Sequence, residues 1–198
     1  MKIFRRLYDW VLHWAESPYG AIALFILAFA ESSFFPIPPD VLLIALILGS
    51  QTKAFRFAII CSVGSVLGGL FGYFIGYSLW HSGVDQFFFT HIPGFTKELF
   101  DKVVLQYDQW GFWIVFTAGF TPIPYKVFTI SSGVVEMEIV MFTIASLVGR
   151  SARFFMVAWL LWKFGAPIKS FIDKYFNWLA LGFTILLVGS FVLLKYAV

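Results

Sequence analysis

The stretch FAESSFFPIPPDVLLIALILGS, residues 29–50, is the part of the sequence that says most about the structure of this chain. Pro36, Pro38 and Pro39 interrupt an apolar run, and a proline lacks the backbone N–H and disfavours a helical residue before it. The freed backbone groups are costly in hydrocarbon, so such a break persists only inside protein or beside a water-filled cavity. Glu31 and Asp40 flank the break, and ionisable groups at membrane depth indicate a functional site. The pattern predicts a re-entrant hairpin over residues 19–50, built from two half-helices that meet at a polar kink.

A second copy of this pattern lies in the other half of the chain. The stretch FTPIPYKVFTISS, residues 120–132, repeats Pro-Ile-Pro 86 residues later and predicts another break at Pro122 and Pro124. In this alignment Lys126 stands opposite Asp40. The copy predicts a second re-entrant hairpin over residues 111–138.

A further match follows each copy. GSVLGGLFGYF, residues 64–74, is answered 81 residues later by ASLVGRSARFF, residues 145–155, with Arg150 and Arg153 in place of Gly69 and Gly72. Proline-interrupted segments in corresponding positions of two halves are typical of transporters with a binding site between the repeats. The sequence therefore predicts an inverted repeat, in which each hairpin is followed by a full transmembrane helix.

Composition supports an all-α polytopic membrane protein with a single membrane domain over residues 1–198. The chain is 60% hydrophobic and only 13% charged, which excludes an ordinary soluble domain. Its continuous apolar runs lack the alternation of a transmembrane β-barrel. Cys61 is the single cysteine, so the chain has no intrachain disulfide. The net charge of +3 suits anionic lipid surfaces and gives no reason to expect nucleic acid.

The remaining segments are assigned from apolar run length and charge spacing. We expect an interfacial amphipathic helix at 1–17, transmembrane helices at 57–79, 139–162 and 178–194, and an interfacial stretch at 163–177. A polar extramembrane segment covers 80–110, where Thr96 is the expected N-cap of a helix to about Gln109. The span at 57–79 carries a glycine at every fourth position, predicting a smooth helix-packing face of Gly64, Gly68, Gly72 and Gly76.

The basic residues predict the orientation in the membrane. If both broken segments are re-entrant, one side holds eight basic residues and the other holds three. The richer side is the cytoplasmic one by the positive-inside rule. We therefore expect a multi-pass membrane protein with a cytoplasmic N-terminus.

Five charged residues fall within the predicted hydrocarbon zone: Glu31, Asp40, Lys126, Arg150 and Arg153. Each costs at least about 2.5 kcal/mol there, so they should face one another or a wet cavity. One interpretation is a structural ion-pair cluster, with Asp40 on Lys126 and Glu31 on an arginine. The other is a substrate and proton site, in which the three cations bind an anion such as phosphate and the two carboxylates neutralise charge or take up protons.

Motifs for other chemistry are missing from the sequence. It has no HExxH or GxSxG motif, and Ser131 and Ser132 lack a positioned base, so no enzyme activity is expected. His81 and His91 have no partner at metal-ligand spacing and are assigned to the surface. We expect no metal and no cofactor.

These residues are also where the chain resembles the DedA family, the SNARE-associated Golgi protein or VTT-domain superfamily, and especially its YqaA-like branch. The resemblance is carried by Glu31, Pro36 and Asp40, by the glycines of 68–76, by GFTPIPYK at 119–126, and by Gly149-Arg150 with Arg153. It implies two re-entrant hairpins in inverted repeats, an inner-membrane location and translocation of polyprenyl phosphates or phospholipids, in some members with protons. Many members have R-x2-P-x3-R in the second hairpin, where this chain has Gly119, Pro122 and Lys126, which leaves Arg150 or Arg153 to supply the charge.

The sequence thus favours a lipid-phosphate or phospholipid flippase or scramblase with a role in membrane or envelope homeostasis. Its expected partners are membrane lipids, anionic or phosphate-bearing, and the oligomeric state, including a homo-oligomer, stays open. A proton-coupled transporter of a small anion or another ion is the first alternative. A non-transporting membrane scaffold that anchors residues 80–110 is the second.

Overall fold

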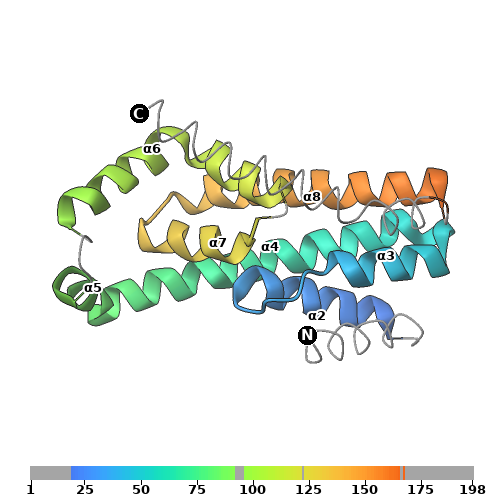
Figure 1. Cartoon of the computed structure of the whole chain (residues 1–198), viewed down its shortest axis with the longest axis horizontal. Helices are drawn as coiled ribbons and strands as arrows, with labels where there is room; N and C mark the ends of the chain where they lie inside the picture. Colours follow the sequence, from blue (N-terminus) through green and yellow to red (C-terminus); the bar gives the residue numbers. More distant parts are fainter. Residues whose placement is uncertain (1–18, 92–95, 122, 166, 168–198) are drawn as a thin grey trace.

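The computed structural model describes residues 19–91, 96–121, 123–165 and 167, and these residues form helices and connections without a strand. The predicted elements at 1–17 and 178–194, most of the stretch at 163–177, and Pro122 lie outside the described residues. The elements in order (Figure 1) are α2 (Gly20–Ser33), α3 (Asp40–Gly49), the 3-10 turn η1 (Gln51–Lys53), α4 (Ala54–Leu79), the π-helical turn η2 (Trp80–Val84), α5 (Asp85–His91), α6 (Lys97–Phe120), α7 (Tyr125–Val134) and α8 (Ile139–Phe164).

Both proline-containing segments are broken helices. α2 ends at Ser33, where the N–H groups of Phe34 and Phe35 both bond to the carbonyl of Ala30 at 2.8 and 2.7 Å, and α3 begins only at Asp40. α6 ends at Phe120 and α7 begins at Tyr125. Figure 1 shows the chain reversing direction at each break, so each segment forms a pair of helical arms.

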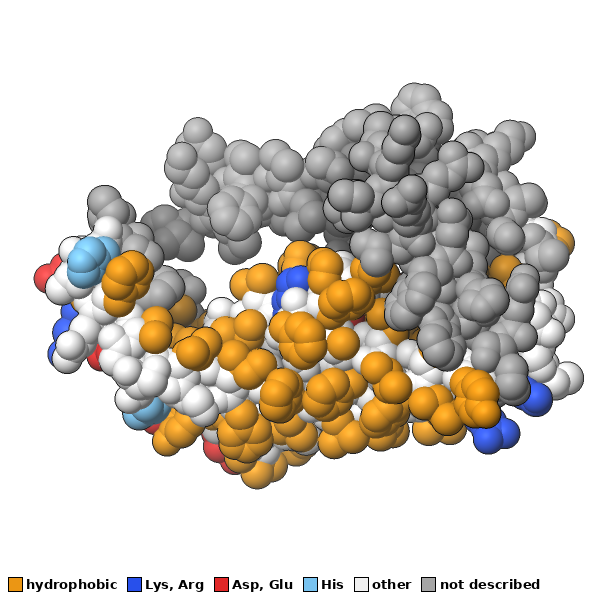
Figure 2. All heavy atoms as spheres, turned by 90° about the horizontal axis from the view of Figure 1, so that it is seen from below, with side chains coloured by type: hydrophobic (Ala, Val, Ile, Leu, Met, Phe, Trp, Pro, Cys, Tyr) orange, Lys and Arg blue, Asp and Glu red, His pale blue; other side chains and the backbone are white. Residues whose placement is uncertain are grey.

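Among the described residues, two helices are long and apolar enough to cross a membrane. α4 and α8 have 26 residues each, about 39 Å at 1.5 Å per residue, against about 30 Å for the hydrocarbon core. They lie side by side. Their outward faces expose large apolar side chains such as Leu67 on α4 and Ile144 on α8, and Figure 2 shows a broad hydrophobic surface. Such a surface suits lipid contact rather than water.

The two halves of the chain have corresponding helices, and the second arm of each broken segment packs on the long helix of the other half. α3 and α7 have 10 residues each, and Asp40 and Tyr125, where they begin, are 85 residues apart, as are Ala54 and Ile139 at the starts of α4 and α8. The first arms α2 and α6 pack on α4 and α8 of their own half, whereas α7 packs on α4 and α3 packs on both α8 and α4. These contacts between the two halves bring both helix breaks to the centre of the molecule.

The glycines of α4 allow this close approach. A Cβ on Gly68 would overlap the carbonyl of Phe29 on α2, and one on Gly76 would overlap a carbonyl of α7. Gly64 also contacts α2, and Gly72 contacts both α2 and α7. Any side chain at these positions would push the hairpin arms away from α4.

The expected end of a helix near Gln109 is wrong. Thr96 caps α6 as predicted, since its hydroxyl accepts a hydrogen bond from the N–H of Leu99 at 3.2 Å. The helix then continues to Phe120, because no proline interrupts the chain between Thr96 and that point. The part of the polar segment that begins at Lys97 and the first arm of the second broken segment are therefore one helix.

Candidate functional site

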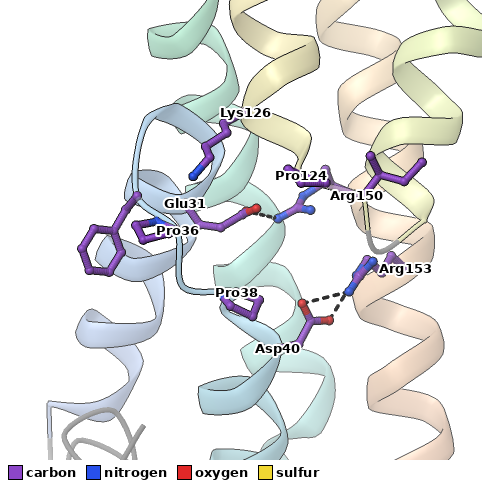
Figure 3. Close-up of a pocket in the computed structure, with 10 residues that line it drawn as sticks. Glu31, Pro36, Pro38, Asp40, Pro124, Lys126, Arg150 and Arg153 are labelled. Carbon is purple, nitrogen blue, oxygen red and sulfur yellow. Dashed lines mark hydrogen bonds and ion pairs between the residues drawn. The ribbon is translucent and has the colours of Figure 1, made fainter. Parts of the chain in front are cut away.

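The two helix breaks line one cavity of about 440 Å³ at the centre of the molecule. All five charged residues that the sequence placed in the membrane contribute to it (Figure 3), and its lining consists of Glu31, Phe35, Pro36, Pro38, Asp40, Ile123, Pro124, Lys126, Arg150 and Arg153. Pro39 is buried beside it at the start of α3.

Each charged side chain comes from a helix end or from the middle of α8. Glu31 belongs to the last turn of α2, while Asp40 and Lys126 belong to the first turns of α3 and α7. Arg150 and Arg153 are three residues apart on α8 and therefore share a face. Because α3 and α7 both begin at the cavity, the positive ends of their dipoles favour negative charge there.

Glu31 and Arg150 form a buried ion pair. Nη2 of Arg150 is 2.7 Å from Oε2 of Glu31, and their side chains are only 3% and 11% exposed. Nε of Arg150 donates to the hydroxyl of Ser65 on α4 at 2.5 Å, and the hydroxyls of Ser65 and Ser32 are 2.7 Å apart. This polar network joins α2, α4 and α8.

Asp40 and Arg153 form a second pair, which is less deeply buried than the first. Nε and Nη2 of Arg153 lie 3.1 and 3.0 Å from the two oxygens of Asp40, which is a bidentate contact. The side chains are 14% and 17% exposed. The expected pairing of Asp40 with Lys126 is therefore wrong: the packing of α3 on α8 brings the carboxylate to the arginine.

Lys126 makes no side-chain hydrogen bond or ion pair with any residue in the described part of the chain. It extends from the start of α7 beside the first break (Figure 3). With three cations and two carboxylates in its lining, the cavity has one positive charge in excess. It is suited to hold an anion.

Several residues that support the site were not singled out by the sequence. Ser65 and the rings of Tyr125 and Phe154 surround Arg150, with its guanidinium carbon 4.9 and 4.7 Å from the two ring centroids. Tyr125 is fixed in turn by a hydrogen bond to Ser146. Polar residues inside otherwise apolar spans were the available signal, but their partners depend on helix packing.

No metal-binding group of His, Cys, Asp or Glu occurs within the described residues. The side chain of His81 is exposed, and its Nε2 is 3.3 Å from a carboxylate oxygen of Glu136.

Comparison with known proteins identifies a matching domain family and several relatives. The profile of the VTT domain matches residues 35–163. An uncharacterised protein of Haemophilus influenzae is 39% identical over 87% of this chain and 90% of its own length, and one of Histophilus somni is 34% identical over 90% and 93%. The undecaprenyl phosphate transporter A of Staphylococcus aureus is 28% identical over 75% of this chain and 71% of its own length. No solved structure matches significantly.

Proposed function

Because the chain belongs to the VTT-domain family, which is the DedA family, we propose that this membrane protein translocates a lipid phosphate or phospholipid by flipping or scrambling it. The observation that carries the proposal is the cavity in which two proline-broken segments meet three cations and two carboxylates. A lipid phosphate needs positive charge to compensate for its lost hydration as it leaves the aqueous surface. We expect this translocation to support membrane or envelope homeostasis.

The depth of the cavity supports this function. Arg150 lies near the middle of α8, and its partner Ser65 lies near the middle of α4. Among the described helices, these two are the ones long and apolar enough to span, so we expect the cavity to lie near the midplane of the bilayer. The transition state of head-group translocation has its charge at that depth.

The relative from Staphylococcus aureus supports a lipid phosphate as the substrate. Its name assigns it a polyprenyl phosphate, which combines a long apolar chain with a phosphate monoester. The cavity described here has the charge to receive such a group, and the apolar outer faces of α4 and α8 suit the lipid chain.

We also propose the membrane arrangement that this function needs. The two broken segments are re-entrant and enter from opposite faces, as inverted repeats, in the bacterial inner membrane. The excess of basic residues on one side then places the N-terminus in the cytoplasm. Alternating access would expose the cavity to each side in turn.

A flux assay tests the proposal. The full chain is reconstituted into phosphatidylcholine vesicles that carry a trace of NBD-labelled phosphatidic acid, without any ion gradient, and dithionite is added outside. We expect more than half of the fluorescence to be bleached, against half in protein-free vesicles and a reduced excess with Lys126→Gln. Bleaching of only half would contradict lipid translocation. Uptake of inorganic phosphate under a proton gradient would then favour the small-anion transporter, and no movement of either would favour the scaffold.

A further inference from the structure

We infer that the two ion pairs of the cavity have different roles. The Arg150–Glu31 pair is structural and stays intact, whereas an anionic head group breaks the Arg153–Asp40 pair by binding to Arg153. The inference rests on the proposed function. In the loaded state Arg153 and Lys126 hold the phosphate, and the displaced Asp40 carboxylate takes a proton from water.

The side chain of Arg150 is fixed by hydrogen bonds and by contacts with two aromatic rings. Its Nη2 and Nε are bonded to Glu31 and Ser65, and aromatic rings of Tyr125 and Phe154 lie over its guanidinium. Moving it toward a ligand would break these contacts and leave the buried Glu31 unpaired, which is strongly unfavourable. Arg150 therefore contributes positive potential without changing partners.

Arg153 is placed to exchange its partner. In the described residues its only hydrogen-bonding partner is Asp40, and both side chains reach the cavity. Its bidentate contact with two carboxylate oxygens has the geometry that it would make with two phosphate oxygens. A phosphate can thus replace the carboxylate without loss of hydrogen bonds to the arginine.

The charge balance explains why a proton would be taken up. A phosphate monoester carries nearly two negative charges at about pH 7.5, because its second pKa is about 6. Since the cavity has one positive charge in excess, such a ligand would leave it one charge negative. Protonation of Asp40 restores neutrality. A phosphodiester, with one charge, needs no proton.

Asp40 is the group suited to this protonation. The charged and titratable groups around it are Arg150 and Arg153 on α8, Lys126 on α7, Glu31 on α2 and Cys61 on α4. Glu31 keeps its own arginine throughout, so Asp40 alone loses its counter-charge, and an unpaired carboxylate in a partly buried site favours its neutral form. The start of α3 offsets only part of this effect.

Binding of dioctanoyl phosphatidic acid to the full chain in detergent, measured by calorimetry between about pH 6.5 and 8.5, tests the inference. Because binding takes up a proton at Asp40, the wild-type affinity should fall as pH rises. Asp40→Asn should bind at least about fivefold more tightly at the upper end of this range, since no carboxylate competes for Arg153, and should lose this extra pH dependence. The matched control Asp101→Asn, an exposed carboxylate of α6, should behave as wild type. The ionisation of the lipid itself is common to all variants.

Ser65→Ala should keep the pH dependence of the wild type, because it removes the Nε partner of Arg150 without changing the charge of the cavity. An unchanged pH dependence in Asp40→Asn, or its loss in Ser65→Ala, would overturn the inference while leaving lipid-phosphate binding intact. A wild-type protein that binds no phosphatidic acid would overturn the proposed function and the inference with it.

Discussion

Replacing Glu31 by glutamine should destabilise the protein strongly. The substitution keeps the shape of the side chain but leaves the guanidinium of Arg150, whose side chain is 3% exposed, without its counter-charge. Breaking a buried ion pair from one side costs about 3–5 kcal/mol. The new amide still offers an acceptor to Nη2, and Ser65 still accepts from Nε at 2.5 Å, so the lower end, about 3 kcal/mol, is expected.

That loss is large enough to measure by thermal unfolding in detergent. If the unfolding entropy resembles that of soluble chains of this length, about 3 kcal/mol lowers the Tm by roughly 6–12 °C. Asp40→Asn is the matched control, because it breaks the less deeply buried pair with Arg153 and should therefore cost less than Glu31→Gln.

A double variant separates pairing from other effects of the substitution. Glu31→Gln with Arg150→Met removes the buried cation as well, and the hydroxyls of Ser32 and Ser65 remain bonded to each other at 2.7 Å. Most of the lost stability should return, since an apolar replacement of a buried pair is often neutral. A Tm of Glu31→Gln equal to that of Asp40→Asn, or no recovery in the double variant, would refute this account of the pair.

Three further outcomes are expected. Gly68→Ala should lower the Tm through overpacking worth about 1–3 kcal/mol, whereas Gly49→Ala, where nothing lies within 4 Å, should not; similar Tm values for both would argue against close helix packing at α4. Lys126→Gln should reduce phosphatidic acid binding while the Tm stays within about 2 °C, because a change that breaks no buried pair costs about 0.5 kcal/mol at most; an equal fall in stability would point to a structural role. In a background without the native cysteine, Lys53→Cys and Thr90→Cys should react with an impermeant thiol reagent from opposite sides of the membrane, and labelling from the same side would exclude the proposed orientation.

The sequence alone was sufficient for the helical breaks and for the set of charged residues. Proline excludes a regular helix whatever surrounds it, so the breaks between α2 and α3 and between α6 and α7 follow from local covalent geometry. The cost of an isolated charge in hydrocarbon predicted that Glu31, Asp40, Lys126, Arg150 and Arg153 gather, and all five line one cavity. The glycine at every fourth position predicted a packing face because helical periodicity is also local.

Which cation meets which carboxylate was decided only by the tertiary structure. The repeat alignment placed Lys126 opposite Asp40, but the carboxylate pairs with Arg153, because α3 packs on the α8 of the other half. Ser65 on α4 and the ring of Tyr125 on α7 became partners of Arg150 because α4 packs on both α7 and α8. Pairing depends on distances between helices that are far apart in the chain, and charge and periodicity along one segment contain no information about those distances.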